Sequence, residues 1–395
     1  MDLYNIVDNQ HLDKFAELQS YCFGVDKELV KFELDNMFGK DDSIILGAFE
    51  DDLLQGALVI NDFEIYWQGM EVKMGGIGGV ATFPEARQNH AVEKLLIESL
   101  KMMNDNNQVF SLLAPFAYSF YRKYGWEYGS RNKRLEISIN DLSHFQSGDF
   151  SVKPINKDHI QSIKKVYEHF YCSYNGATKR TDLRWELIFA RNAKNDIHSY
   201  GVFDNEEKLR GYIFYKINSD GMIVQEIVYD SLEVRKQLMR FIFVHRAQFD
   251  KVTLKVPYDN NLDILLKNPR QHMEVSSGMM VRIINAKKIL EMYPYKNIND
   301  LKFSISIEDK YAAWNNNTFQ INIDDNNVEV KEIEDIEDIE PDIRCSIQVL
   351  SQIVFGFLSW EEAMELDLIT CNDDMIIGKL NNSMPKRCSY VTDPF

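Results

Sequence analysis

Four glycines in five positions, Gly75, Gly76, Gly78 and Gly79, constrain the fold of this chain more than any other feature. They stand in the stretch MGGIGGVATFPEARQNHAVEKLL, where a short β-branched run, a proline and a helical pattern follow them. Glycine weakens a strand because it has no side chain to pack and loses more conformational entropy on folding. We therefore expect something other than a side chain, such as a ligand or another backbone, to lie close against this strand.

Length and pattern divide the chain into three segments. A chain of 395 residues exceeds one ordinary core, and its 45% hydrophobic and 12% aromatic residues are typical of a globular protein. The order of helical and strand patterns places three domains at 1–145, 146–285 and 286–395, with a linker at 140–150 (NDLSHFQSGDF). We expect a mixed α/β (α+β) fold.

The first segment begins with two helical patterns, at about 11–23 and 27–38, and continues with strands. Polar turns at 51–52 and 68–69 separate apolar runs, which predicts two hairpins. An amphipathic helix follows the glycine-rich strand, and a buried strand is expected at 109–114.

The second segment repeats this order but lacks a glycine-rich turn, because IVQEIVYD runs directly into SLEVRKQL. We expect it to bind no cofactor. In the third segment Ser359 and Glu362 form an S-x-x-E capping box that predicts a helix start. The run EIEDIEDIE at 332–340 is expected to be a solvated turn or a charged edge strand.

Charge and cysteine usage exclude several functions. The chain has 44 Lys and Arg against 61 Asp and Glu, a formal net charge of -17, so nucleic acid and anionic membranes are poor partners. A cationic substrate would be attracted, although an ordinary acidic protein has the same charge. We find no signal peptide and no membrane span. Five scattered cysteines without a C-x-x-C pair favour a reducing cytoplasm and argue against zinc or disulfides.

The stretch after the glycines predicts a phosphate site. Its strand is Val80 to Thr82, its polar turn covers 83–89, and its helix begins near His90. Such a turn presents unpaired backbone N–H groups and the positive end of the helix dipole. The turn matches neither the P-loop nor the dinucleotide fingerprint, so nucleoside triphosphates and NAD are disfavoured.

The pattern V-x-T-x-P-x-x-R, followed by a helix, a strand and Y-x-x-x-G-[FWY], resembles the acetyl-CoA-binding region of the GNAT superfamily of N-acetyltransferases. The stretches GGVATFPEARQNHAVEKLL and LLAPFAYSFYRKYGWEY and the ending PKRCSYVTDPF are similar to one branch, the enhanced intracellular survival (Eis) proteins. The resemblance covers essentially the whole chain. It implies two tandem GNAT-like domains followed by a sterol-carrier-like domain.

The resemblance implies acetyl-CoA as co-substrate and no metal. The pantetheine arm would pair with the strand, and the pyrophosphate would lie on the amides of the following turn. The predicted cofactor-binding residues are Val80, Ala81, Thr82, Arg87, Gln88, Asn89, His90, Ala91, Val92 and Glu93. The superfamily prefers glycine where His90 stands, and we expect His90 to be tolerated if its φ is helical.

Two catalytic residues are implied by the resemblance. Tyr121 corresponds to a general acid that protonates the departing CoA thiolate, and the α-carboxylate of Phe395 corresponds to a base. An alkylamine of pKa ~10 is only about one part in 10³ neutral at pH 7, a penalty of ~4 kcal/mol. The intrinsic pKa of an α-carboxyl, ~3.5, is low for this role. Burial, a like charge such as Asp393, or a water relay would have to compensate.

The sequence predicts an N-acetyltransferase in which the third domain delivers Phe395 to the first. The amine would attack the thioester directly, and the acceptor would be polycationic: aminoglycoside-like, a polyamine or a lysine side chain. By resemblance, the protein would be a homo-oligomer, a hexamer. The alternative is a non-catalytic module that binds CoA or lipid. Candidate acceptor contacts, from their place in the chain, are Asp26, Glu64, Tyr66, Trp67 and Asp393.

Overall fold

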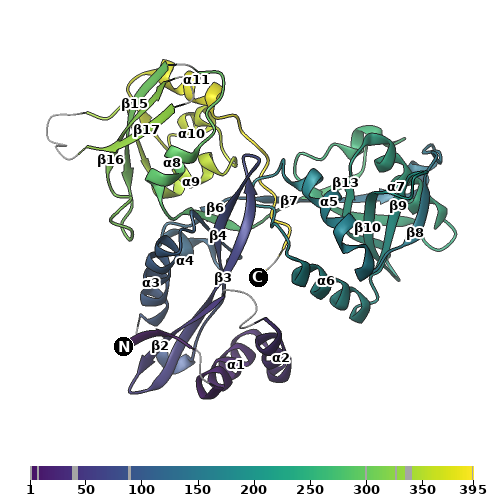
Figure 1. Ribbon diagram of the computed structural model, residues 1–395, viewed down its shortest axis with the longest axis horizontal. Coiled ribbons are helices and arrows are strands. Elements are labelled where there is room, and N and C mark those ends of the chain that lie inside the picture. The colour runs from purple at the N-terminus through teal and green to yellow at the C-terminus, as the bar shows by residue number, and fades with distance from the viewer. Residues whose placement is uncertain are drawn as a thin grey trace.

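The computed structural model is a mixed α/β protein, which confirms the predicted fold class. It describes residues 2–6, 9–37, 43–87, 90–298, 300–324, 327–333, 340–393 and 395. Within these residues the strands form three sheets, one in each of three packed domains (Figure 1). Most of the acidic run predicted at 332–340 lies outside the described residues.

The first sheet has the strand order β1-β2-β3-β4-β5-β14-β6. Its strands are β1 Asp2–Asn5, β2 Ile44–Glu50, β3 Leu53–Trp67, β4 Met70–Thr82, β5 Phe110–Leu113, β6 Glu127–Tyr128 and β14 Met280–Ile283. Its helices are α1 Asn9–Phe23, α2 Lys27–Met37, α3 Ala91–Asp105 and α4 Tyr118–Arg122, with a 3₁₀ turn, η1 Pro84–Ala86. Helices α1 and α2 cover one face of the sheet, and α3 and α4 cover the other.

Both predicted hairpins of the first domain are confirmed. Asp51 and Asp52 have φ of 49° and 60°, and Gln68 and Gly69 have φ of 53° and 82°. Two successive left-handed residues match the right-handed twist of the flanking strands, and Asp and Gly tolerate this conformation best. The second turn ends a long hairpin of β3 and β4 that runs through the centre of the molecule to the third domain (Figure 1).

The second sheet has the order β13-β7-β12-β11-β10-β9-β8. Its strands are β7 Arg131–Ser138, β8 Ser151–Pro154, β9 His198–Phe203, β10 Leu209–Asn218, β11 Gly221–Tyr229, β12 Lys251–Pro257 and β13 His272–Ser277. Its helices are α5 Ile160–Tyr171, α6 Asp182–Lys194 and α7 Leu232–Val244, with 3₁₀ turns η2 Ile139–Leu142, η3 Lys157–His159 and η4 Leu262–Leu265. Helices α5 and α6 pack on one face and α7 on the other.

The first two domains exchange strands at their boundary. Strand β7 lies within the predicted range 1–145 but pairs in the second sheet, and β14 lies within 146–285 but pairs in the first. The two crossings are joined at Ser130, whose carbonyl accepts from Gly278 N at 2.8 Å and whose Oγ accepts from Met279 N at 2.8 Å. The expected linker at 140–150 instead packs Leu142 and Phe145 into the second core. The exchange rests on long-range pairing, which local patterns do not encode.

The third sheet has the order β17-β16-β15-β18-β19. Its strands are β15 Asp300–Glu308, β16 Thr318–Asp324, β17 Asn327–Glu332, β18 Ile343–Ser346 and β19 Thr370–Cys371. Its helices are α8 Ala286–Met292, α9 Ile347–Val354, α10 Trp360–Glu365 and α11 Asp374–Ser383. The predicted capping box is confirmed at the start of α10, where the Ser359 side chain accepts from Glu362 N and the Glu362 side chain accepts from Ser359 N.

The third domain shares one hydrophobic core with the end of the β3–β4 hairpin. Trp67 is fully buried there, lies against Phe110 with ring centroids 5.3 Å apart, and donates its Nε1–H to Val354 O at 3.0 Å. The second link between the two domains is a buried ion pair from β14, in which Arg282 Nη2 lies 2.8 Å from Asp309 Oδ2. The third domain is therefore fixed on the first.

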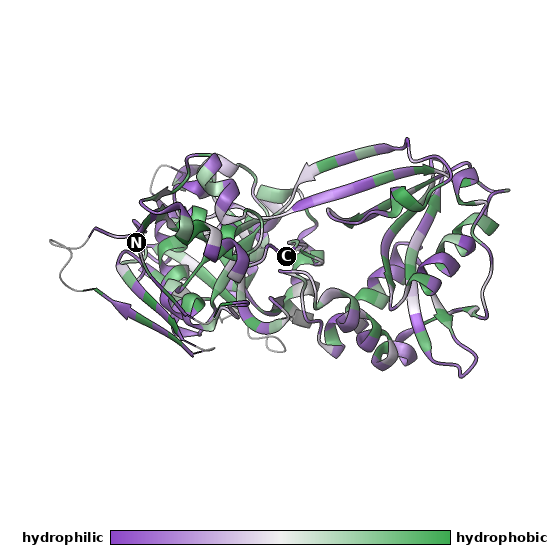
Figure 2. Cartoon of the chain, turned by 90° about the horizontal axis from the view of Figure 1, so that it is seen from above, coloured by the Kyte–Doolittle hydropathy of each residue, from purple (hydrophilic) through white to green (hydrophobic). Residues whose placement is uncertain are grey.

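Residues 175–179 lie where the three domains meet. Ala177 O accepts from Tyr66 N at 2.9 Å, so a short segment of the second domain pairs alongside the end of β3. On the other side, Asn175 forms a parallel bridge with Ser389, and Tyr390 N donates to Asn175 O at 2.9 Å. The C-terminal tail is thus held by backbone pairing, and the C-terminus lies in the middle of the molecule in both views (Figures 1 and 2).

Candidate active site

The glycine-rich strand contains a bulge, as its composition predicts. Ala57 pairs with Ala81 and Val59 with Gly78, so two residues of β4 oppose one residue of β3. Gly79, inside the bulge, has a φ of +57°, which favours glycine. The pairing of β4 with β5 ends at Ile77, so in the described structure β4 has no strand partner on that side beyond this residue. A ligand's amide groups could pair with this open edge.

The chain's own C-terminal residue lies against two of the four glycines. A Cβ added at Gly76 would lie 2.9 Å from the Phe395 ring carbons Cδ2 and Cε2. A Cβ added at Gly78 would lie 3.1 Å from the Phe395 carboxyl carbon. The Phe395 ring also packs on Phe63, with ring centroids 5.2 Å apart. The expected close backbone is therefore present at Gly78, whereas Gly75, Gly76 and Gly79 are approached by side chains.

Tyr121 lies in the same packed cluster as several predicted cofactor-binding residues. It is on α4, is 2% exposed, and shares its hydrophobic cluster with Val80, Ala91 and Val92. Burial raises the pKa of its hydroxyl above the ordinary value, so the phenol stays protonated at working pH. Among the described residues the hydroxyl has no hydrogen-bond partner. The predicted acid therefore borders the strand and helix that would hold the cofactor.

His90 adopts a conformation that glycine would favour. Its φ is 56° and its ψ 24°, at the N-cap of α3, so the condition under which we expected the histidine to be tolerated, a helical φ, is not met. Its Nδ1 lies 3.0 Å from Glu93 Oε2, which accounts for the orientation of the ring. Gln88 and Asn89 lie outside the described residues, and Arg87 ends the 3₁₀ turn η1. A conformation that glycine adopts readily is therefore taken here by a residue with a side chain.

Replacement of His90 by glycine is expected to raise the free energy of unfolding by about 0.5–1 kcal/mol. The left-handed conformation costs a non-glycine residue about 1–2 kcal/mol, part of which the larger unfolded-state entropy of glycine offsets. Urea unfolding of His90→Gly measures the change. His90→Ala is the matched control, because it also loses the Glu93 contact but retains the strained Cβ. Equal stabilities of the two variants would contradict this explanation.

The candidate acceptor contacts are distributed over different environments. Trp67 cannot contact an acceptor, because it is 0% exposed between the first and third domains. Tyr66 packs into the core of the second domain. Glu64 lies 3.2 Å from Lys179 Nζ, and Asp26 accepts from the backbone N–H of Glu28 at the start of α2. The contacts that these residues make do not bring them together in one pocket.

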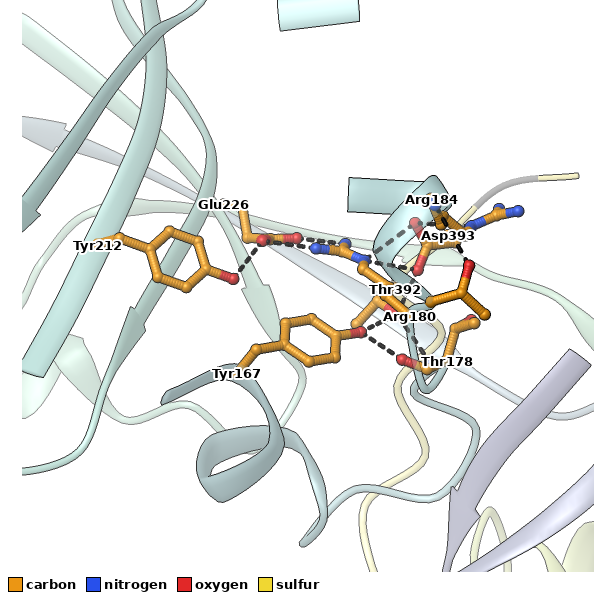
Figure 3. A network of polar contacts seen from close by, with 9 residues as sticks. Tyr167, Thr178, Arg180, Arg184, Tyr212, Glu226, Thr392 and Asp393 are labelled. Atoms are coloured by element: carbon orange, nitrogen blue, oxygen red, sulfur yellow. Dashed lines mark hydrogen bonds and ion pairs between the residues drawn. The ribbon is translucent and has the colours of Figure 1, made fainter. Parts of the chain in front are cut away.

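Asp393 belongs to a buried polar network between the tail and the second domain (Figure 3). Its Oδ2 accepts from Arg180 Nε at 2.9 Å, and its Oδ1 lies 3.7 Å from Arg184 Nε. Burial disfavours ionisation, but the two arginines outweigh it and hold the pKa of Asp393 below its ordinary value. Asp393 is therefore not the uncompensated like charge that the sequence suggested for Phe395.

Sequence reasoning missed Arg180 and its second partner, Glu226. The two lie 46 positions apart, and Arg180 and Asp393 lie 213 positions apart, so no local spacing connects them. A lone arginine before a helix carries no distinguishing motif. Only the assembled tertiary structure brings these three residues together.

The described residues contain neither a candidate metal site nor a candidate membrane span. No group of three or more His, Cys, Asp or Glu side chains there could hold a metal ion. No helix in the same part of the chain is both long and apolar enough to cross a bilayer.

Three stretches of the sequence match known domain families. Residues 4–129 and 176–283 each match the acetyltransferase (GNAT) domain, and residues 286–392 match the sterol carrier protein domain. These matches confirm the predicted order of two GNAT-like domains and a sterol-carrier-like domain. No curated protein matches the sequence.

Solved structures share the fold over the whole chain. A protein of unknown function from Enterococcus faecalis V583, a probable N-acyltransferase, is 23% identical with a TM-score of 0.90, covering 100% of this chain and 99% of its own. A GCN5-related N-acetyltransferase from Anabaena variabilis ATCC 29413 is 20% identical with a TM-score of 0.87, covering 100% of both chains. Eis1 from Mycobacterium abscessus is 16% identical with a TM-score of 0.82, also covering 100% of both. At these identities the likeness shows the three-domain fold.

Proposed function

We propose that this chain, an N-acetyltransferase that belongs to the GNAT acetyltransferases and has the fold of Eis1, transfers the acetyl group of acetyl-CoA to an amine of a polycationic acceptor. The observation that carries the proposal is the position of Phe395. Its carboxyl group lies against Gly78, where β4 opens away from β5. A carboxylate at this place borders the edge on which a thioester would lie.

The first domain supports acetyl-CoA as the co-substrate. The open edge of β4 from Gly78 to Thr82 offers backbone groups to the amides of a pantetheine arm. The N-terminus of α3, which follows at Ala91, offers unpaired N–H groups and a positive dipole to a pyrophosphate. In the second domain β11 leads into α7, whose N-cap is Ser231, without glycine. We therefore assign one cofactor site per chain, in the first domain.

The proposed reaction is a direct transfer. The amine lone pair attacks the thioester carbonyl carbon, an amide C–N bond forms, and the C–S bond breaks. The amine's proton goes to the Phe395 carboxylate, directly or through water, and Tyr121 donates its proton to the sulfur of CoA. Because burial raises the pKa of Tyr121, this donation must be concerted with C–S cleavage. The protonated Phe395 carboxyl and the deprotonated Tyr121 then return to their starting states by proton exchange with solvent.

Charge supports a cationic acceptor. A net charge of -17 attracts polyamines, aminoglycoside-like molecules and lysine-rich segments, and it repels nucleic acid. All five cysteines are free thiols, which suits a reducing cytoplasm. By the family resemblance we expect a homo-oligomer, a hexamer, whose mass light scattering would measure.

Release of free CoA thiol in the presence of a panel of amines tests the proposal. We expect turnover with a polyamine, and we expect the KM for that polyamine to rise severalfold when ionic strength increases from about 0.05 to about 0.2 M. The KM for a monoamine is the matched control and should change less. A protein that binds acetyl-CoA but acetylates no amine would instead support the non-catalytic CoA- or lipid-binding alternative.

A further inference from the structure

We infer that the second domain acts as a clamp for the C-terminal tail, and that Arg180 and Asp393 are positioning residues for the Phe395 carboxylate. The inference rests on the proposed function of that carboxylate. It assigns a role to a domain in which we place no cofactor site.

Arg180 is the centre of the clamp (Figure 3). It is 4% exposed, and its guanidinium lies over the rings of Tyr167 and Trp185, 4.4 and 4.6 Å from their centroids. Its Nη1 and Nη2 donate to the two carboxylate oxygens of Glu226 at 2.9 and 2.6 Å, and its Nε donates to Asp393. Two neighbouring aromatic rings, 5.2 Å apart, and two carboxylates therefore hold the guanidinium in place.

Glu226 is itself fixed by the second domain. It stands on β11, and its Oε1 accepts from the hydroxyl of Tyr212 at 2.6 Å. Successive hydrogen bonds from Tyr212 to Glu226, Arg180 and Asp393 therefore fix the tail relative to the second sheet. Arg180 and Arg184 together balance the two carboxylates, so the network can be buried without an uncompensated charge.

The residue before Asp393 is held as firmly. The Thr392 hydroxyl accepts from Thr178 N at 3.1 Å, lies 2.9 Å from the Tyr167 hydroxyl, and donates to Asp393 at 3.0 Å. Arg184, next to Asp393, places its guanidinium 4.6 Å from the centroid of the Phe63 ring. Phe63 is the ring on which Phe395 packs, so the network continues to the final residue.

Two peptide units separate Asp393 from Phe395, a reach of about 7 Å. Because Asp393 is fixed, the terminal carboxylate is confined to a small region beside Gly78. Chain ends otherwise fray, and misplacement of a catalytic group by about 1 Å can reduce the rate about 100-fold. The clamp therefore preorganises a base that lies at the end of the chain.

The test is Asp393→Asn, which keeps the shape of the side chain and removes its charge. We expect kcat to fall about 10- to 100-fold with the KM for acetyl-CoA changed less than about twofold. In hydrogen exchange, the amide of Tyr390, which is bonded to Asn175 O, should exchange faster. Asp309→Asn is the matched control, since it breaks another buried Arg–Asp pair, with Arg282, away from the tail. Its kcat should not change.

A second comparison separates positioning from a general structural effect. In a chain that ends at Asp393 and lacks the last two residues, Asp393→Asn should cause no further loss of kcat, because the group it positions is already gone. Equal losses in both backgrounds, or an unchanged kcat in the full chain, would overturn the inference. If Asp393→Asn does not fold, Thr392→Val tests the same clamp through a neutral group. Inactive wild-type protein with a slowly exchanging Tyr390 amide would reject the proposed function while leaving the tail clamp in place.

Discussion

Conversion of the Phe395 α-carboxylate to a carboxamide is expected to lower kcat by about 100- to 1,000-fold. The amide is nearly isosteric, so the ring stays on Gly76 and Phe63, but the group beside Gly78 can no longer accept a proton. The affinity for acetyl-CoA should remain within about twofold, because the predicted cofactor contacts lie on other residues. Semisynthesis of the tail gives this variant, and the free acid made by the same ligation is the control.

The pH profile gives this prediction its sharpest test. Without a base, only the small neutral fraction of the amine reacts, so the rate should rise about tenfold per pH unit between about pH 7 and 9. Wild-type protein should show a shallower rise over the same range. A carboxamide variant with full activity, or with a profile parallel to that of the wild type, would remove Phe395 from the mechanism.

The sequence predicted those features whose cause is local. The hairpin turn at 51–52, the capping box at Ser359 and the amphipathic pattern of α3 all depend on residues close together in the sequence. The four glycines predicted that a backbone or ligand would lie close to β4, and at Gly78 the backbone of the tail lies there. In each case the residue type restricts the conformation directly.

Long-range features could not be predicted in this way. The exchange of β7 and β14 between the sheets depends on pairing of Val281 with Leu112, far along the chain, and nothing in either strand specifies its partner. The place of Trp67 in the core could not be predicted for a similar reason. Its position in the sequence made it a candidate acceptor contact, whereas two of its neighbours, Tyr293 and Val354, belong to a domain that begins more than 200 residues later.

The candidate site combines features that the local sequence indicates with features that depend on long-range contacts. The departure from glycine at His90 was visible in the sequence, but its left-handed backbone was not, because the same residue is also compatible with a helical φ. The terminal carboxylate was expected near the first domain from family resemblance. The network of Arg180 and Glu226 that fixes the tail required contacts from all along the chain.

Replacement of Tyr121 by phenylalanine is expected to lower kcat by about 100- to 1,000-fold with little change in acetyl-CoA affinity. The substitution removes the proton that neutralises the departing thiolate and leaves the buried ring in its cluster. Since no described residue hydrogen-bonds to this hydroxyl, the free energy of unfolding should change by less than about 0.5 kcal/mol. Thiol release should show this fall in kcat, and calorimetry should show that acetyl-CoA still binds.

Tyr118→Phe, on the same short helix, is the matched control with the opposite expected result. The Tyr118 hydroxyl donates to Gly278 O at 2.6 Å, beside the crossing between the first two domains. Loss of this bond should lower the free energy of unfolding by about 1 kcal/mol and leave kcat within about twofold. Stability and catalysis would thus separate between two tyrosines three positions apart. If Tyr121→Phe retains wild-type kcat, water or another group must protonate the sulfur, and Phe395 would be the remaining candidate for proton transfer.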